Sequence, residues 1–260
     1  MLELYHWEPN TYFLKPLIAL HEKRVAFTGR WFDPTAFEQF AADFPRNTES
    51  TLQLEREGPV LVHEGVVVSG SFFMLEYIAE TFPGADLCPG GAYEQYRARA
   101  WGQVLTAVGS GIGVLGCAKY LAPALRRIEP ATLAARLQAI EPLERRKAWA
   151  AITDGTYDEA ALAAVRERLK APVKRIESTL EAGAWMAGAD YSIADIDAFS
   201  LLNSLPSLAP DVLNRQDTPW VLEFLERMRA RPAVQAALAL SRSGKPQEAF
   251  VPAAEASRWG

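Results

Sequence analysis

The sequence predicts an α/β domain at the N terminus followed by an all-α domain. Short strand-like and helix-like patterns alternate through roughly the first 80 residues, as is typical of βαβ construction. From Tyr93 onward the strand signals disappear, and Ala, Leu, Arg and Glu recur at helical spacing. A stretch rich in Gly and Pro, Pro83–Gly91, separates the two patterns. We therefore expect one domain over residues 1–82, a linker over 83–91 and an all-helical domain over 92–260.

Hydrophobic alternation and turn residues predict the elements of the first domain. In chain order they are a strand at Leu2–His6, a helix at Phe13–Lys23, a strand at Val25–Phe32, a short helix and irregular loop within Pro34–Glu57, strands at Val60–His63 and Val66–Val68, and a helix at Ser69–Thr81. Glu64 and Gly65 between the last two strands favour a hairpin turn. The hydroxyls of Ser69 and Ser71 are expected to cap the last helix.

The second domain is expected to contain helices only. They are predicted at Tyr93–Tyr120, in broken segments within Pro130–Thr153, and at Asp158–Leu180, Ile193–Leu205 and Pro219–Ala230. Ser192 and Asp195 are spaced as a capping box at the start of one helix. After Arg231 we expect a short helix and then a polar, frayed end.

Composition and charge exclude several classes of function. Of the 260 residues, 49% are hydrophobic and 23% are charged, and the formal net charge is -5. Because charges of both signs are interspersed, there is no basic stripe for nucleic acid or an anionic membrane. The N terminus lacks a basic region followed by an apolar stretch, and Cys88 and Cys117 form no CxxC motif, so a reducing cytoplasm is expected. The three histidines lack metal-ligand spacing, and no metal is expected.

A formal GxGxxG pattern occurs at Gly111, Gly113 and Gly116. A dinucleotide site requires this pattern directly after a strand, but here it lies within a helical segment. The small residues are therefore expected to let helices approach closely or to leave room for an aromatic substrate.

The arrangement of the two domains resembles the soluble glutathione transferases, which join a thioredoxin-like domain to a helical one. Gly58 and Pro59 stand at the place of that family's cis-proline turn, and Ser71 at the place of a serine that holds the glutamyl carboxylate of glutathione. A helix N terminus favours such an anion. The run Tyr191–Ile196 is similar to the family's capping motif. The resemblance implies glutathione as co-substrate, with Gly58, Pro59 and Ser71 as its binding residues.

A finer resemblance points to the bacterial lignin β-aryl-etherases. The segments that carry it are Leu14–Leu17, Leu20–Lys23, Asp33–Pro34, Phe37–Gln39, Glu76–Tyr77, Phe82–Pro83, Arg97–Ala98 with Trp101, and the insertion from Ile140 through Trp149 to Gly155. The family reaction that this resemblance implies is attack of the glutathione thiolate on the carbon that bears an aryl ether, with a phenolate leaving. The implied substrate is therefore an aromatic ether.

The expected glutathione site departs from the family at three places. Similar enzymes have a Ser just before the Leu14–Leu17 segment to stabilise the thiolate, whereas this chain has Tyr12 and Phe13. A thiol with a pKa near 8.5 needs a donor to ionise at neutral pH, and a phenyl ring supplies none. Gly70 replaces the acidic or amide residue before the helix-opening serine. The loop Asn47–Glu57 is longer than the family's.

Three interpretations follow. The chain is a subunit with a degenerate glutathione site that supports a catalytic paralogue, in a homodimer or a heterodimer. Alternatively, it is a complete enzyme in which Thr11 or Tyr12 supplies the hydroxyl that activates the thiolate. The third interpretation is a non-catalytic protein that binds aromatic ligands. The sequence does not identify a catalytic residue.

Overall fold

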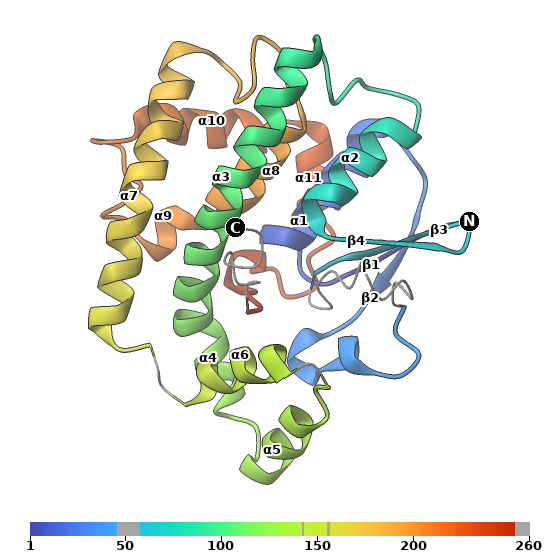
Figure 1. The fold of residues 1–260 in the computed structure, drawn as a ribbon, viewed down its shortest axis with the longest axis vertical. Helices are drawn as coiled ribbons and strands as arrows, with labels where there is room; N and C mark the ends of the chain where they lie inside the picture. Colours follow the sequence, from blue (N-terminus) through green and yellow to red (C-terminus); the bar gives the residue numbers. More distant parts are fainter. Residues whose placement is uncertain (46–57, 142, 155–156, 253–260) are drawn as a thin grey trace.

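The computed structural model describes residues 1–45, 58–141, 143–154 and 157–252. A small sheet stands beside a larger group of helices (Figure 1), which confirms the predicted fold class. The loop Asn47–Glu57, for which the sequence predicts a departure from the family, lies outside the described residues.

The sheet has four strands in the order β2-β1-β3-β4. Their bounds are Leu2–His6 for β1, Thr28–Trp31 for β2, Val60–His63 for β3 and Val66–Ser69 for β4. β1 runs parallel to β2 and antiparallel to β3, and β4 is antiparallel to β3. The predicted hairpin is confirmed, with both turn residues, Glu64 and Gly65, at positive φ.

Strand β2 is shorter than predicted because the residues before it complete the preceding helix. Arg24 adopts the left-handed conformation that ends α1, with φ of 55°. The backbone N–H of Val25 then donates to the carbonyl of Leu20. Val25 is thus bonded to the helix rather than to β1, and pairing of β2 starts at Thr28.

Two helices complete the N-terminal part, α1 over Thr11–Lys23 and α2 over Ser71–Thr81. Short 3-10 turns at Pro34–Ala36 and Glu38–Phe40 stand where a short helix was predicted. Helix α1 is buried along most of its length because it packs against α2 on one side and against helices of the C-terminal part on the other. Its N-terminal end therefore faces both parts of the molecule.

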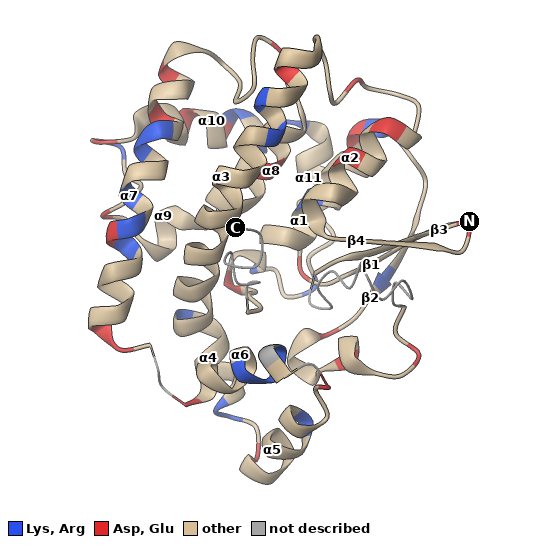
Figure 2. Cartoon of the chain, in the orientation of Figure 1, with Lys and Arg blue, Asp and Glu red and all other residues tan. Residues whose placement is uncertain are grey.

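The C-terminal part is helical, as predicted. The helices are α3 (Ala92–Gly116), α4 (Ala122–Leu125), α5 (Pro130–Gln138), α6 (Leu143–Thr153), α7 (Glu159–Ala182), α8 (Ile193–Leu202), α9 (Leu205–Leu208), α10 (Pro219–Arg229) and α11 (Pro232–Leu238). A π-helical turn, Cys117–Leu121, joins α3 to α4. Figure 2 shows charges of both signs scattered over these helices.

The stretch Ala92–Leu125 is, among the described residues, the one helix whose length and composition would let it cross a membrane. Half of its most apolar window is buried inside the protein. It packs against α7 and α8, which is the position of a core helix.

A buried ion pair joins α1 to α8. The Nζ atom of Lys15 lies 2.6 Å from Oδ1 of Asp197, and both side chains are almost fully buried. The Lys15 ammonium also lies over the ring of Tyr12, 5.2 Å from its centroid. Burial raises the pKa of Asp197, and the neighbouring Lys15 opposes that rise. The pair connects the sheet side of the molecule to the helical side.

The predicted capping box opens α8. Oγ of Ser192 accepts from the N–H of Ala194, while the Asp195 carboxylate accepts from the N–H groups of Ser192 and Met186, both at 2.8 Å. Asp195 is fully buried. The box thus anchors the loop before α8 as well as the helix itself.

Candidate functional site

The residues predicted to bind glutathione flank the β3–β4 hairpin. Val60 pairs with Ser69 in the antiparallel register, at the end of the ladder away from the turn. Gly58 and Pro59 directly precede β3, and Ser71 opens α2 two residues after β4 ends. The cis bond expected at Pro59 is wrong, because no peptide bond among the described residues is cis. The trans form is the ordinary preference of a proline bond, by about 0.5–1 kcal/mol.

The N terminus of α2 is open to an anion. The cap residue is Gly70, and no side chain caps the helix, so the expected capping by Ser69 and Ser71 is wrong. The reason is geometric, since Ser69 still pairs in β4 and Oγ of Ser69 is buried without a hydrogen-bond partner. The first N–H groups of the helix accordingly keep their capacity to donate.

Gly70 has a backbone conformation that suits glycine. Its φ of 83° and ψ of 105° lie outside the regions that L-residues favour. An aspartate or glutamate there would be strained.

The first turn of α1 directs its three side chains to different surroundings. Thr11 has φ of 44°, which is unusual for a β-branched residue. The Tyr12 hydroxyl points toward α3, where it would lie 3.3 Å from a Cβ on Gly109. Phe13 is only 2% exposed. Of the two hydroxyl candidates, Tyr12 is thus directed toward the helical part and away from the ring of Phe13.

An aromatic cluster surrounds Phe13. The ring of Phe13 lies edge-on to Trp7 and to Phe32, with centroid distances of 6.3 and 5.7 Å. Phe44 packs on Phe32 from the other side at 4.9 Å. Val251, from the far end of the chain, completes the cluster and is itself 3% exposed. Apolar side chains therefore fill the space beside residue 13.

The segment that contains Val251 docks onto the loop between β1 and α1. The Glu8 carboxylate accepts from Oγ of Ser241 at 2.5 Å and from the N–H groups of Arg242 and Ser243 at 3.0 and 2.8 Å. Nδ2 of Asn10 donates to the carbonyl of Ala249 at 2.9 Å. We call residues 241–252 the C-terminal strap.

Two further contacts hold the strap. Arg242 lies over the ring of Trp31, 4.5 Å from its centroid. At the other end, Arg145 of α6 donates to the carbonyl of Pro252 at 3.1 Å. The frayed end expected from the sequence is therefore wrong for residues 241–252. These residues are held by hydrogen bonds from the β1–α1 loop and from α6, and by a cation–π contact with β2.

The comparisons with known proteins agree with this architecture. Residues 127–232 match the family model of the glutathione S-transferase C-terminal domain. Protein LigF of Sphingobium sp. strain SYK-6 is 27% identical over 241 residues, which span 90% of this chain and 91% of LigF. The crystal structure of the β-etherase LigF from that strain has a TM-score of 0.81 at 26% identity, and covers 92% of this chain and 99% of the LigF chain. The chain resembles the glutathione S-transferase superfamily, with a β-etherase among the proteins that it matches.

Within the superfamily, the likeness extends beyond LigF. A glutathione S-transferase from Methylobacillus flagellatus, solved with glutathione bound, has a TM-score of 0.61 at 19% identity, with coverage of 91% of this chain and 98% of that one. This second comparison shows the shared fold. The comparison with LigF shows that the chain is similar to a β-etherase over nearly its whole length.

The glycine pattern in α3 serves packing, as the sequence context indicates. A Cβ on Gly111 would lie 2.9 Å from the Leu169 side chain of α7. A Cβ on Gly116 would lie 2.2 Å from the ring of Phe250 in the strap. The glycines thus admit a neighbouring helix and the strap.

The sequence analysis did not predict the strap or the residue that binds it, Glu8. Phe250 and Val251 are two apolar residues in an otherwise polar, Pro-containing stretch, which gives no periodicity. The available signal was Glu8 itself, an acidic side chain directly after a buried strand. Such a carboxylate requires hydrogen-bond partners from elsewhere in the chain.

Proposed function

We propose that this chain is a cytoplasmic subunit of a glutathione-dependent β-aryl-etherase whose own glutathione site is degenerate, and that it supports a catalytic paralogue in a dimer. The observation that carries the proposal is the burial of Phe13 against Val251. The likeness to LigF supplies the reaction class.

The chemistry of the thiolate supports this proposal. Ionising a thiol at neutral pH requires a hydroxyl, an N–H group or a cation beside the sulfur. The cluster around Phe13 offers rings and a Val side chain, and apolar surroundings raise the pKa of a thiol instead of lowering it. Glu8 and Asn10, which precede α1, are bonded to the strap, and the Tyr12 hydroxyl is directed toward α3. A thiol at this position would stay protonated.

The other end of the predicted site keeps features that suit glutathione. Among the described residues, no side chain caps the N terminus of α2, and the buried hydroxyl of Ser69 has no hydrogen-bond partner. Pro59 precedes β3 and Ser71 follows β4, the two strands that pair in the hairpin. The N terminus of α2 could thus still bind the carboxylate of glutathione, whereas aromatic side chains fill the place expected for the sulfur. This combination supports descent from an active transferase more than a new catalytic design.

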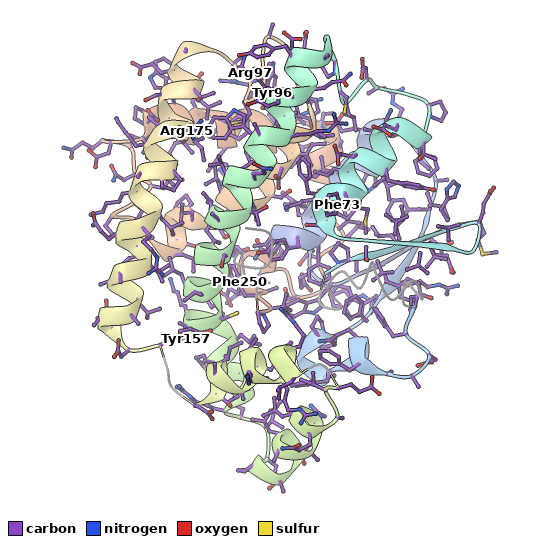
Figure 3. The ribbon with its side chains drawn as sticks, in the orientation of Figure 1. Phe73, Tyr96, Arg97, Tyr157, Arg175 and Phe250 are labelled. Carbon is purple, nitrogen blue, oxygen red and sulfur yellow. The ribbon has the colours of Figure 1, made fainter. Side chains whose placement is uncertain are left out.

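Exposed aromatic side chains support a role in association. Phe73 on α2 is 50% exposed, and Tyr93 and Tyr96 on α3 are 66% and 63% exposed. Figure 3 shows Phe73 and Tyr96 on these two helices. Tyr93 and Tyr96 stack at 6.0 Å. Apolar groups gathered on a surface commonly mark a contact with another protein, and the proposed occupant is a paralogous transferase subunit.

The test compares the chain alone with the chain and its paralogue. The purified chain should neither bind glutathione in calorimetry nor cleave an aryl ether. Co-expression with an etherase paralogue should give a mixed dimer whose turnover per active subunit exceeds that of the paralogue alone. Etherase turnover by the single chain would overturn the proposal. Failure to form a mixed dimer would instead favour the non-catalytic ligand-binding interpretation.

One observation favours the second interpretation, a complete enzyme. Thr11 holds a positive φ, and strained backbone of this kind costs about 1–3 kcal/mol and is concentrated at functional sites. If Thr11 activates glutathione, Thr11→Val abolishes turnover by the single chain, while Tyr12→Phe leaves it intact. Equal loss in both variants, or no activity to lose, counts against this interpretation.

A further inference from the structure

The C-terminal strap begins beside a histidine. The ring of His6, at the end of β1, lies edge-on to Trp31 of β2, with centroids 6.0 Å apart. Arg242 of the strap lies over the same Trp31 ring, 4.5 Å from its centroid. The Glu8 carboxylate, two residues after His6, accepts from the N–H groups of Arg242 and Ser243. A titratable ring thus lies among the contacts that hold the first residues of the strap.

The surroundings of His6 favour the neutral ring. The side chain is 6% exposed, and Nδ1 lies 2.8 Å from the carbonyl oxygen of Trp7. Because a carbonyl only accepts, Nδ1 carries the proton of the neutral ring. Nε2 faces β2, where it lies 3.0 Å from a Cβ built on Gly29. A second proton would sit on Nε2, and glycine has no side chain that could accept from it.

Two charges act on His6 from different segments. Burial lowers the pKa of His6 below its ordinary value of 6.5, against the hydrogen bond to the backbone, and then Arg242 lowers it further while Glu8 raises it. The charged residue of β2, Arg30, bonds to the Glu3 carboxylate. When the strap leaves, Arg242 leaves with it, and Glu8 loses its bonds to the strap. His6 is then less shielded from water, has lost a repelling charge and keeps an attracting one.

Docking of the strap and protonation of His6 therefore oppose each other. The ring binds a proton less tightly with the strap docked than with the strap released, so release takes up a proton. An equilibrium of this kind moves by about a factor of ten for each pH unit between the two pKa values. Docking is strongest above about pH 6.5, the ordinary pKa of the ring, and weakens as the pH falls from there to the lower pKa of the docked state.

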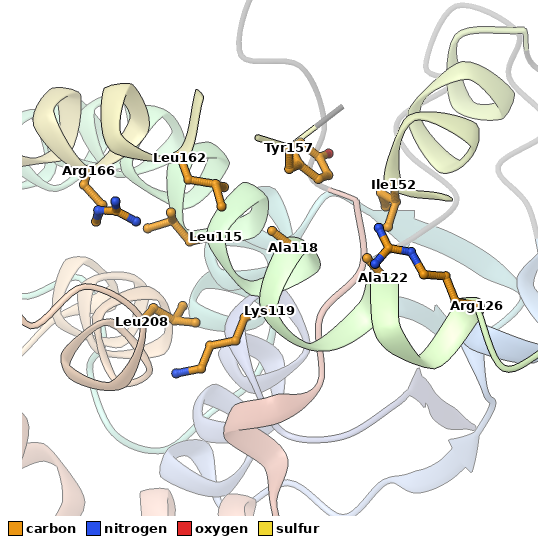
Figure 4. Close-up of a pocket in the computed structure, with 10 residues that line it drawn as sticks. All are labelled: Leu115, Ala118, Lys119, Ala122, Arg126, Ile152, Tyr157, Leu162, Arg166 and Leu208. Atoms are coloured by element: carbon orange, nitrogen blue, oxygen red, sulfur yellow. The ribbon is translucent and has the colours of Figure 1, made fainter. Parts of the chain in front are cut away.

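The far end of the strap covers apolar surface. Phe250 fills the space beside Gly116 of α3, and Val251 packs with Phe13. Ala118, two residues after Gly116, lines a separate hollow instead (Figure 4). Release of the strap therefore uncovers the face of the helix at Gly116 and the aromatic cluster around Phe13.

We propose that the C-terminal strap is an acid-released cover of the aromatic cluster around Phe13, with His6 as the group that senses pH. Protonated His6 repels Arg242 and competes with the N–H groups of the strap for the charge of Glu8, so both effects favour release. The device controls access to the apolar cluster. It goes beyond the proposed etherase role and does not depend on whether the chain binds glutathione.

Hydrogen exchange of the full chain between about pH 7.5 and about pH 5 tests the proposal. Exchange rates are converted to protection factors, which remove the pH dependence of the exchange reaction itself. We expect the protection factors of residues 241–252 to fall by up to about tenfold for each pH unit below 6.5, and those of α1 and α7 to fall less. Constant protection of the strap would overturn the proposal. An equal fall in all three segments would also overturn it, because it would show a general loss of stability in acid.

Two histidine variants locate the sensor. His6→Asn removes the titrating ring and keeps a side-chain N–H that can donate to the Trp7 carbonyl, so the strap should stay protected in acid. His21→Gln is the control, because burial also lowers the pKa of His21, which lies in α1 and takes no part in the contacts described for the strap. The control should keep the fall in protection. A fall that persists in His6→Asn, or that disappears in both variants, would refute the role of His6.

A second pair of variants keeps His6 and changes exposed charges of the strap. Arg242→Gln removes the cation that protonated His6 repels, so the fall in protection per pH unit should become smaller. Lys245→Gln removes an exposed cation that pairs with Glu248 and should leave the fall unchanged. Because both residues are exposed, this pair gives an answer even where His6→Asn does not fold. The same fall in both variants would overturn the proposal.

Discussion

Phe250 occupies the space that any side chain on residue 116 would need. A Cβ built on Gly116 would lie 2.2 Å from the ring of Phe250, far inside contact distance. The same ring stacks on Tyr120 with an interplanar angle of 6° and a centroid distance of 6.0 Å. The C-terminal strap can therefore pack on α3 in this position because residue 116 has no side chain.

Gly116→Ala should displace the strap. The added methyl group forces Phe250 to move, and overpacking of this kind costs about 1–3 kcal/mol of unfolding free energy. Chemical denaturation measures the loss. The control is Gly183→Ala, because no atom lies within 4 Å of a Cβ there. A Gly116→Ala variant as stable as the control would show that the strap is not seated as described.

Glu8→Gln should loosen the same strap at its other end. The neutral amide accepts more weakly than the carboxylate and turns a donor toward the N–H groups of Arg242 and Ser243. We expect faster proteolysis and faster hydrogen exchange within residues 241–252. Glu248→Gln removes only an exposed pairing with Lys245 and serves as the control. Unchanged hydrogen exchange in Glu8→Gln would show that Glu8 does not hold the strap.

Lys15→Met should be strongly destabilising because it leaves the Asp197 carboxylate buried without its partner. Breaking a buried pair costs about 3–5 kcal/mol, whereas replacing both members by apolar residues is often neutral. The double variant Lys15→Met/Asp197→Leu should therefore regain most of the loss. Lys170→Met removes an exposed pair with Glu167 and should leave the denaturation midpoint close to that of the wild type. If the losses of unfolding free energy from the two substitutions simply added in the double variant, Lys15 and Asp197 would not be coupled.

Asp195 should make stability depend on pH. Burial raises the pKa of this carboxyl from 3.8 to about 7, against the opposing hydrogen bonds from Met186 and Ser192. The folded state thus holds the proton more tightly than the unfolded state. The contribution of this group is present below about pH 4 and is lost as the pH rises to about 7. Unfolding free energies of the wild type, minus those of Asp195→Asn, should fall across that window.

The secondary structure of the first domain followed closely from local pattern. β1 and β3 have the predicted bounds, because period-two alternation and turn residues determine short strands locally. β2 was overpredicted because Val25 and Phe27 have strand-forming side chains, while the left-handed cap at Arg24 draws Val25 to α1. A bond to the preceding helix overrode β propensity here.

The predicted site residues illustrate a different limit. The sequence identified Phe13 as unable to support a thiolate, which is a matter of chemical type alone. It gave no signal that Val251, 238 residues later, packs in the cluster around Phe13. The same segment also contacts Glu8 and Gly116, and neither residue indicates from its own surroundings in the sequence which segment packs there. Long-range docking of an aperiodic segment leaves no local pattern to detect.

The C-terminal strap is part of the same covalent chain as the loop that it covers. It therefore competes for that space as an intramolecular ligand, at an effective concentration set by the tether and not by the amount of protein. Each tenfold excess of that effective concentration over the dissociation constant of the strap adds about 1.4 kcal/mol to the cost of displacing it. Dilution leaves this competition unchanged, whereas cutting the chain before Ser241 would convert the strap into a peptide that simply diffuses away.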